Sequence, residues 1–323
     1  MKPALLLLRK FVDSDRAYLR ERLAPHMDWL EPDGDSDQAL LPLAEKADAA
    51  LGASVSRQVL EAATRLKLIQ TPGAGVEHLD LALLATRGIT VCNSHSHADV
   101  VAEHALTLAL ALMRKIPFHD RVLKAGRWFR PASKEDVRFM SESLVGATVG
   151  LVGYGRVGQA IARLLKSFEV ELLVHTRRST PNKFFEARPV DLAALFAQAN
   201  VIFVSLPLTR ITRGLIGSET FAAAAKTPYL VNVGRAETIA REALLAALDG
   251  GRLGGAALDV PYGDRDAVEG FAGFLDRDDV ILSAHRAGTL HGASPHLADA
   301  ADNLIAFATG APLRNRVDPD AGY

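Results

Sequence analysis

Near the middle of the chain runs the segment Thr148-Val149-Gly150-Leu151-Val152-Gly153-Tyr154-Gly155-Arg156-Val157-Gly158, whose second part matches the pattern G-x-G-x-x-G. By itself such a string also fits a plain tight turn. Here an apolar run over 148–152 leads into the glycines and a helical pattern over 157–168 leaves them. This order lets the backbone approach a pyrophosphate at a helix N-terminus. The segment therefore predicts a dinucleotide site formed by Gly153, Gly155, Arg156, Val157 and Gly158.

The next predicted strand helps to identify the dinucleotide. It ends in Leu172-Leu173-Val174-His175-Thr176 and is followed by Arg177-Arg178. An NAD site usually places Asp or Glu at this strand end, where the carboxylate accepts hydrogen bonds from the ribose 2′-hydroxyl. Thr176 leaves no carboxylate to repel a 2′-phosphate, and arginine pairs with phosphate through its planar fork. The sequence favours NADP (NADPH) over NAD, with Thr176, Arg177 and Arg178 at the phosphate. The alternative is that both arginines belong to a solvated loop.

Short apolar runs alternate with helical patterns on both sides of this segment. Upstream, runs at 4–8, 47–51, 68–71 and 89–92 alternate with helical patterns at 13–23, 56–66 and 81–87. Downstream, runs at 172–174, 201–204, 229–233, 256–260 and 280–283 alternate with helical patterns at 191–197 and 242–248. Apolar runs of this length between helices are typical of parallel sheets covered on both faces. The predicted fold class is therefore α/β, with two doubly wound parallel-sheet domains.

Two further helices are predicted outside these sets. The pattern over 99–115, with Asp99 as a possible cap, is apolar around nearly its whole circumference. Such a helix must pack against something large, such as a domain boundary or a subunit interface. Pro117 is expected to end it, and the charged stretch from there to Thr148 is interpreted as a connecting excursion. A last helical pattern over 295–308 ends at Gly310.

Composition limits the classes of function. The chain has 323 residues, enough for two domains, and 37 Lys plus Arg against 38 Asp plus Glu leave no positive excess to hold a nucleic acid. A single cysteine, Cys92, excludes an internal disulfide and a cysteine-based zinc site. The longest apolar stretch, 105–113, is too short to cross a membrane. We expect a cytoplasmic protein without a metal site, since His95, His97 and His104 have no acidic or cysteine partner at ligand spacing.

Several further motifs follow one another along the chain. They are Thr71-Pro72-Gly73-Ala74-Gly75-Val76, Val100-Val101-Ala102-Glu103-His104, Leu144-Val145-Gly146-Ala147-Thr148, Val231-Asn232-Val233-Gly234-Arg235, Gly254-Gly255-Ala256-Ala257-Leu258-Asp259-Val260 and Ile281-Leu282-Ser283-Ala284-His285-Arg286-Ala287-Gly288. Together with the glycine loop, they resemble the D-isomer-specific 2-hydroxyacid dehydrogenase family over most of the chain. The resemblance implies a Rossmann cofactor domain, 99–288, inserted into a flavodoxin-like substrate domain made of 1–98 and 289–323.

The resemblance also assigns the catalytic residues. Arg235 corresponds to the arginine that holds the substrate carboxylate and carbonyl, which a guanidinium does through bidentate hydrogen bonds. His285 corresponds to the acid/base histidine, and imidazole titrates near physiological pH. Asp264 stands where the family usually has the glutamate that orients this histidine. It keeps the charge but is one methylene shorter, and Asp266 is a competing candidate if the register slips.

Other matched positions are expected to bind cofactor or substrate. The loop of Ala74, Gly75 and Val76 corresponds to the backbone amides that receive the substrate carboxylate, an approach that glycine permits. The resemblance places Asp259 and Val233 beside the nicotinamide. It places Pro207 and Thr212 along the adenosine half of the cofactor.

The expected function is hydride transfer between NADP(H) and C2 of a small 2-oxo or 2-hydroxy acid, as in a glyoxylate- or hydroxypyruvate-type reductase. His97 and Trp128 are expected to border this substrate, and Arg286 suggests a second anionic or polar group on it. The alternatives are an NAD-linked member such as a phosphoglycerate dehydrogenase and a non-catalytic dinucleotide-sensing protein on the same fold. The resemblance further implies a homodimer, with the helix over 99–115 at its interface.

Overall fold

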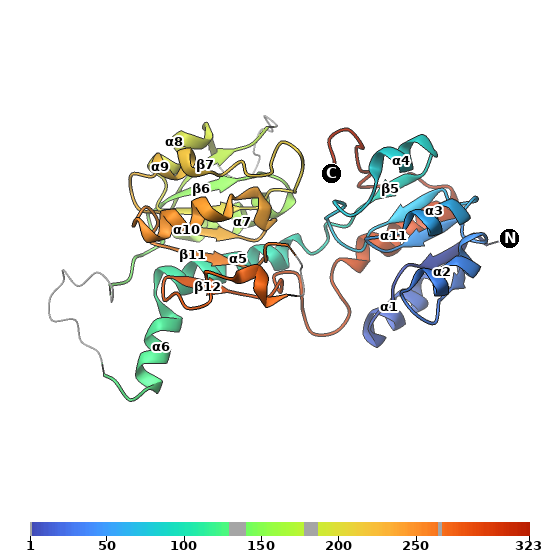
Figure 1. Cartoon of the computed structure of the whole chain (residues 1–323), viewed down its shortest axis with the longest axis horizontal. Helices are drawn as coiled ribbons and strands as arrows, with labels where there is room; N and C mark the ends of the chain where they lie inside the picture. Colours follow the sequence, from blue (N-terminus) through green and yellow to red (C-terminus); the bar gives the residue numbers. More distant parts are fainter. Residues whose placement is uncertain (1, 129–139, 178–186, 264–266) are drawn as a thin grey trace. The chain divides into compact units, whose positions relative to one another are not determined.

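The computed structural model describes residues 2–128, 140–177, 187–263 and 267–323. These residues form two compact units, one of Met1–His97 with Gly288–Tyr323 and the other of Ala98–Ala287 (Figure 1). The end of the chain thus returns to the unit in which the chain begins.

In the described part of the first unit, five parallel strands form a sheet in the order β2-β1-β3-β4-β5. The strands are β1 (Ala4–Leu7), β2 (Asp28–Leu30), β3 (Ala49–Leu51), β4 (Leu68–Gln70) and β5 (Thr90–Cys92). Leu5 and Leu7 share one core with helices α1 (Asp13–Leu23) and α11 (Leu297–Thr309). Leu6 shares the opposite core with α2 (Asp37–Ala44), α3 (Arg57–Ala62) and α4 (Leu81–Thr86). Because successive strand side chains point to opposite faces, the unbroken leucine run of β1 fills both cores.

In the described part of the second unit, seven parallel strands follow the order β12-β11-β10-β9-β6-β7-β8. They are β6 (Thr148–Val152), β7 (Glu171–His175), β8 (Ala187–Pro189), β9 (Val201–Val204), β10 (Tyr229–Asn232), β11 (Gly255–Leu258) and β12 (Val280–Leu282). Val149 and Leu151 pack with α5 (Ala98–Met113) and α7 (Arg156–Leu165) on one face. Val152 packs on the other face with α8 (Leu192–Gln198), α9 (Ser218–Ala222) and α10 (Arg241–Asp249) (Figure 1).

Both strand orders belong to known doubly wound patterns. The first unit has the flavodoxin-like order, and the second has the Rossmann order with one further strand after β11. The predicted fold class, two parallel-sheet α/β domains of Rossmann and flavodoxin-like type, is therefore confirmed. In the second sheet the strand order reverses between β6 and β9, and such sheets bind ligands beside the carboxyl ends of the strands at that point.

The carboxyl ends of neighbouring strands in the second sheet are level. Val152 pairs with Val204, Val204 with Asn232, Asn232 with Leu258, and Leu258 with Leu282. We call this set of strand ends the carboxyl row. Because the row is level, the residues that follow each strand leave the sheet at one edge.

The connection before β6 differs from its prediction. It contains helix α6 (Ile116–Lys124), and the prediction that Pro117 ends the preceding helix is wrong. Helix α5 ends at Met113, the chain turns through Lys115 in the left-handed conformation (φ 52°), and Pro117 lies in the first turn of α6. Proline fits there because the first N–H groups of a helix have no partner within it. Elements β2, α2, β8 and α9 also have no counterpart among the predicted ones.

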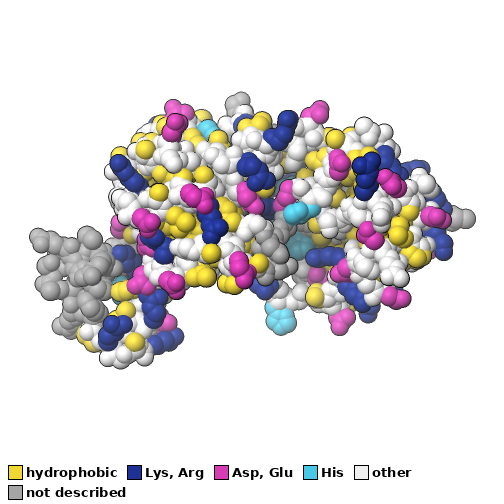
Figure 2. Space-filling view, in the orientation of Figure 1, with side chains coloured by type: hydrophobic (Ala, Val, Ile, Leu, Met, Phe, Trp, Pro, Cys, Tyr) yellow, Lys and Arg dark blue, Asp and Glu magenta, His cyan; other side chains and the backbone are white. Residues whose placement is uncertain are grey.

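The described surface gives two observations about partners. No described helix combines the length and the apolarity needed to cross a bilayer. The face in Figure 2 carries basic and acidic side chains interspersed with one another.

Candidate active site

The glycine loop joins β6 to α7 and is shaped by close backbone contacts. Gly153 has φ 99°, a conformation that L side chains rarely adopt, and its N–H donates to the carbonyl of His175 (3.0 Å). A Cβ atom on Gly158 would lie 2.3 Å from the carbonyl oxygen of Gly153. A Cβ atom on Gly155 would meet nothing within 4 Å, and this exposed glycine is the N-cap residue of α7. The loop therefore packs tightly against β6 while leaving open space at a helix N-terminus, which fits a pyrophosphate.

The end of β7 carries the residues predicted to select the cofactor. His175 contacts the carbonyl of Val190 through Nδ1 (3.2 Å), which ties the strand end to the segment after β8. Thr176 is half-buried at the carboxyl end of the strand, and Arg177 is exposed. Arg178 lies outside the described residues. A threonine thus occupies the position where an NAD site would place a carboxylate.

The loop after β9 lies against the glycine loop, because Ser205 Oγ donates to the carbonyl of Gly153 (3.3 Å). Farther along the loop, Thr212 is buried. Its hydroxyl donates to the carbonyl of Pro207 (2.6 Å) and accepts from the N–H of Thr209 (2.8 Å). The hydroxyl of Thr212 therefore closes this turn, while Pro207 is exposed.

Arg235 is held by buried polar groups at the end of β10. Asn232 donates through Nδ2 to the carbonyl of Arg235 (3.1 Å), and its Oδ1 accepts from the N–H of Gly234 (3.0 Å). Thr238, which is fully buried, also donates its hydroxyl proton to the carbonyl of Arg235 (2.7 Å). The guanidinium donates from Nη1 to the carbonyl of Gly234 (2.8 Å), and the residue is half-buried. Val233 joins the neighbouring strand through an N–H bond to Val204 (3.1 Å).

His285 follows β12 and depends on Asp259 at the end of β11. The carboxylate of Asp259 is fully buried and accepts hydrogen bonds from the hydroxyl of Ser283 (2.7 Å) and the N–H groups of Arg286 (2.8 Å) and Ala287 (3.1 Å). Its backbone carbonyl accepts from the N–H of His285 (2.7 Å). Asp259 thus fixes the loop that carries His285, and its predicted role beside the nicotinamide remains a prediction.

The backbone of His285 is strained. Its φ is 52°, in the left-handed region that a non-glycine residue adopts at a cost of about 1–3 kcal/mol. The bonds to Asp259 on both sides of His285 offset this cost and keep the half-buried side chain in one direction. Asp264 and Asp266, the predicted partners of this imidazole, lie outside the described residues.

The carboxyl row brings the predicted residues of the second unit to one edge. Arg235 and His285 each follow a strand end of that row, on the same side of the sheet as the glycine loop. An arginine, a histidine and a dinucleotide loop therefore share an edge, a set that can bind a carboxylate and move a proton beside a redox cofactor.

The predicted carboxylate loop lies in the first unit, at the end of β4. Three of its carbonyl oxygens accept hydrogen bonds: that of Thr71 from Ser94 Oγ (3.0 Å), that of Gly73 from the N–H of Ser94 (3.0 Å), and that of Ala74 from Asn93 Nδ2 (2.9 Å). The N–H of Thr71 donates to the carbonyl of Cys92 (2.8 Å). Among the described residues, none of these bonds uses the N–H groups of Ala74, Gly75 or Val76. At Gly73 and Ala74 the loop is thus held through its carbonyl groups.

The remaining histidines and the tryptophan occupy different surroundings. His97 lies edge-on against His296, with ring centroids 5.7 Å apart, and burial lowers the pKa of His296. Trp128 is 75% exposed, and Arg286 is also exposed. His104 contacts Ser283 and lies 3.6 Å from the carboxylate of Asp259, and among the described residues no three His, Cys, Asp or Glu side chains gather as a metal site would require.

The single cysteine is not part of this chemistry. Cys92 is fully buried at the end of β5, and burial raises the pKa of its thiol to about 11. The thiol is therefore protonated at neutral pH and unreactive as a nucleophile.

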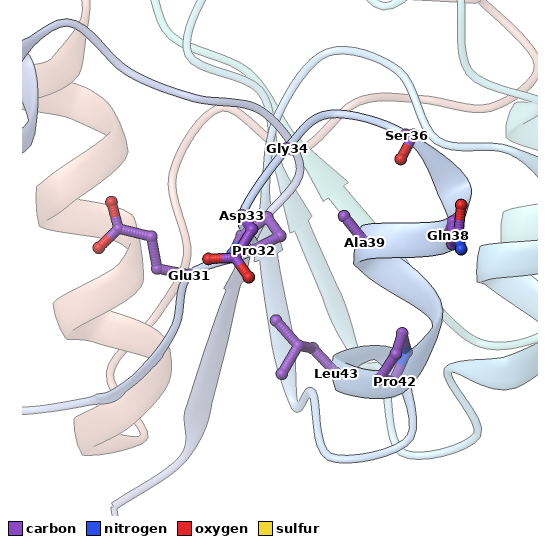
Figure 3. Close-up of a pocket in the computed structure, with 9 residues that line it drawn as sticks. All are labelled: Glu31, Pro32, Asp33, Gly34, Ser36, Gln38, Ala39, Pro42 and Leu43. Atoms are coloured by element: carbon purple, nitrogen blue, oxygen red, sulfur yellow. The ribbon is translucent and has the colours of Figure 1, made fainter.

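A separate pocket of about 520 Å³ opens beside the edge strand β2 (Figure 3). Glu31 and Asp33 line it from the loop after β2, and Ala39 and Leu43 from α2. Glu31 already pairs with Arg16 (3.2 Å) and Arg20 (3.3 Å), so its charge is compensated within the chain. The pocket contains none of the predicted site residues.

Several residues that support the site are absent from the sequence prediction of site residues. Asn232 and Thr238 fix the backbone of Arg235, while Ser283 and His104 contact Asp259 beneath His285. A polar residue at the end of an otherwise apolar strand, as Asn232 is, is the one signal that marks such a role in advance.

Comparison with known proteins identifies the family. The model of the D-isomer-specific 2-hydroxyacid dehydrogenase NAD-binding domain matches residues 106–287. A glyoxylate reductase of Thermococcus onnurineus is 30% identical over 322 residues, which cover 96% of this chain and 94% of the relative. A D-3-phosphoglycerate dehydrogenase of Archaeoglobus fulgidus is 33% identical over 82% of this chain but only 49% of its own length.

A solved structure gives the same result. The NADPH-dependent glyoxylate/hydroxypyruvate reductase of Sinorhizobium meliloti, in complex with NADP and malonate, is 26% identical and aligns with a TM-score of 0.83 over 99% of this chain and 98% of its own. The family model covers more than half of the chain, and the second unit contains all of the matched residues. The chain therefore belongs to the D-isomer-specific 2-hydroxyacid dehydrogenase family, and its second unit is a nicotinamide dinucleotide-binding domain of that family.

Proposed function

We propose that the protein reduces a small 2-oxo acid, of the glyoxylate or hydroxypyruvate type, with NADPH as the preferred cofactor. The observation that carries this proposal is the carboxyl row, which places Arg235, His285 and the glycine loop at one edge of the cofactor sheet. Relatives named glyoxylate reductase match the chain over nearly its whole length, which supports the same substrate class.

The residues of the glycine loop fit a dinucleotide, since Gly155 leaves open space at the N-terminus of α7 and Gly158 permits close packing beneath it. A reduced nicotinamide, when bound, supplies the hydride for C2 of the acid. The pyrophosphate would be held by Gly153, Gly155, Arg156, Val157 and Gly158. The 2′-phosphate would be held by Thr176, Arg177 and Arg178. The adenosine half would lie along Pro207 and Thr212, and the nicotinamide would lie beside Val233 and Asp259.

The protein's own groups perform the other tasks. The guanidinium of Arg235 binds the substrate carboxylate and carbonyl through parallel N–H bonds, and its charge persists at every working pH. As the resemblance implies, we assign the amides of Ala74, Gly75 and Val76 to the binding of a substrate carboxylate, because the hydrogen bonds at Gly73 and Ala74 use carbonyl groups. His285 donates a proton from its imidazole to the substrate oxygen, which becomes the hydroxyl. Asp264 is assigned the orientation of this imidazole.

The test is the initial rate of reduced-nicotinamide oxidation, followed by absorbance, with glyoxylate, hydroxypyruvate, pyruvate, phenylpyruvate and 2-oxoglutarate. We expect turnover, with kcat/KM for NADPH at least about tenfold above that for NADH, because a hydrogen bond to a charged group contributes about 1.5–3 kcal/mol. In the cytoplasm, where we place the protein, a reduced NADP pool would drive the reaction toward the hydroxy acid.

A control variant isolates the cofactor argument. Thr176→Asp places a carboxylate where a 2′-phosphate would lie and should reverse the preference toward NADH. A wild-type preference for NADH would discard the roles of Thr176 and Arg177 while keeping the reaction class. Tight cofactor binding without turnover of any acid would instead favour a dinucleotide-sensing protein.

We also propose that the protein is a homodimer. The resemblance places the helix over 99–115, here α5, at the interface, and we extend that interface to α6, which follows it. Helix α6 exposes Ile116 (57%) and Leu123 (56%), and Trp128 just beyond it is 75% exposed. The double variant Ile116→Asp/Leu123→Asp is expected to weaken self-association at least about 100-fold, since burying each side chain contributes about 1.5–3 kcal/mol. Sedimentation at several concentrations measures this change. Val268→Asp, at a similarly exposed position (59%), should leave the mass unchanged, and a wild-type monomer would refute the assignment.

A further inference from the structure

A partly buried hydrogen-bond chain links helix α5 to the loop of His285. Nε2 of His104 lies 3.0 Å from Oγ of Ser283 and 3.6 Å from Oδ1 of Asp259. The side chain of His104 is 27% exposed and that of Asp259 is fully buried. The chain thus joins elements that are far apart in the sequence, namely α5, the end of β11 and the loop after β12.

The direction of each hydrogen bond follows from the number of protons. The hydroxyl of Ser283 has one proton and donates it to Asp259 Oδ1 (2.7 Å). Its oxygen must then accept from His104, so Nε2 of His104 carries a proton. Protons are therefore donated from His104 Nε2 to Ser283 Oγ, and from Ser283 Oγ to Asp259 Oδ1. This direction allows the hydroxyl of Ser283 a single orientation.

This order bears directly on the loop of His285. Asp259 Oδ1 accepts both from Ser283, two residues before His285, and from the N–H of Arg286, one residue after it. His285 itself has the left-handed backbone conformation. Such a conformation persists only where surrounding bonds hold it. A freely rotating hydroxyl at position 283 would remove one of those bonds for part of the time.

We propose that His104 is a positioning residue for the reaction: by donating to Ser283 it fixes the Ser283–Asp259 bond and so the direction of the His285 imidazole. This inference rests on the proposed function, in which His285 is the proton donor. His104 itself touches neither substrate nor cofactor in this assignment.

The experiment compares variants that remove or retain the donor. His104→Phe keeps an aromatic ring without the N–H group, His104→Gln keeps an N–H donor, and Ser283→Ala removes the hydroxyl. We expect His104→Phe and Ser283→Ala to lower kcat about 3- to 10-fold, the factor of one net hydrogen bond, with KM for NADPH unchanged. His104→Gln should recover most of the loss. His26→Phe, in the turn after α1 of the other unit, is the control for loss of a histidine and should leave kcat unchanged.

Two further measurements distinguish a role of His104 in positioning His285 from a general structural role. In the double variant His104→Phe/Ser283→Ala, the loss in kcat should equal that of Ser283→Ala alone, because both changes break one chain. The solvent isotope effect on kcat should rise in His104→Phe, since a misdirected imidazole slows the proton transfer. Additive losses, or an unchanged kcat in His104→Phe, would overturn the proposal.

A last measurement keeps the inference separate from the proposed function. If the wild type turned over no acid, the proposed function would fail, and the ring resonances of His285 in isotope-labelled protein would decide the positioning question. A shifted and broadened His285 resonance in His104→Phe, restored in His104→Gln, supports the inference. An unchanged resonance overturns it.

Discussion

Replacing His285 with glutamine is expected to lower kcat for 2-oxo acid reduction by about 10²–10⁴-fold, the usual contribution of a positioned general acid. Glutamine retains hydrogen-bonding groups of similar reach but has no titratable proton to give to the nascent hydroxyl. The loop should survive the change, because its bonds to Asp259 come from Ser283 and from the N–H groups of Arg286 and Ala287.

Steady-state rates with NADPH and the best acid measure this effect. Binding of NADPH, followed by the fluorescence of the reduced nicotinamide, should stay within about twofold of the wild type, because His285 is assigned no bond to the ground-state cofactor. A loss in kcat below about fivefold would remove His285 from the proton transfer, whatever its place in the sequence motif.

Replacing Arg235 with glutamine is expected to lower kcat/KM by about 10²–10³-fold, since removing one partner of a desolvated charge pair costs about 2–5 kcal/mol. The guanidinium is assigned both the carboxylate and the developing oxyanion, so the loss should appear in KM and in kcat. The backbone of the variant should hold, because Asn232 and Thr238 bind the carbonyl of residue 235 independently of its side chain.

The matched variant Arg235→Lys tests the geometry rather than the charge. Lysine keeps the charge but cannot make two parallel bonds to a carboxylate, so we expect a recovery of only part of the lost kcat/KM. The inhibition constant of oxamate, an unreactive analogue of a 2-oxo acid, should rise in the same order. Full activity in Arg235→Lys would mean that the site needs only a positive charge.

The fold was predictable where one physical signal dominated. The glycine loop between β6 and α7 follows from steric demands that only glycine meets, and the apolar strands follow from burial on both faces. Elements without that signal escaped prediction. Strand β2 is three residues long and only partly buried at a sheet edge, and α2 contains Pro42, which ordinarily argues against a helix. Helix α6 was hidden by Pro117, which also fits a helix start.

The candidate site was predictable to the same limited extent. Motifs single out Arg235 and His285 as candidates, because the proposed chemistry calls for those residue types. Asn232, Ser283 and His104 act through contacts with residues close to the site but, for His104, distant in sequence. Asn232 is marked in the sequence as a polar residue at the end of an apolar strand, whereas no periodicity or local pattern records the contacts of Ser283 and His104, so only the folded chain reveals those.

The level carboxyl row also decides where the chain tolerates changes of length. The strands of the second sheet end together at one edge but begin unevenly at the other, since β9 starts opposite the second residue of β6 and β12 opposite the second residue of β11. One residue inserted between Asn232 and Arg235 would lengthen the segment after β10 by up to about 3.3 Å and so displace the guanidinium from its place. The same insertion in the turns that precede the strands leaves every strand end in place. We therefore expect the second unit to tolerate an inserted residue in the turns at the amino edge of this sheet, and to lose activity when the same residue is inserted in the segments that follow the strands at the carboxyl edge.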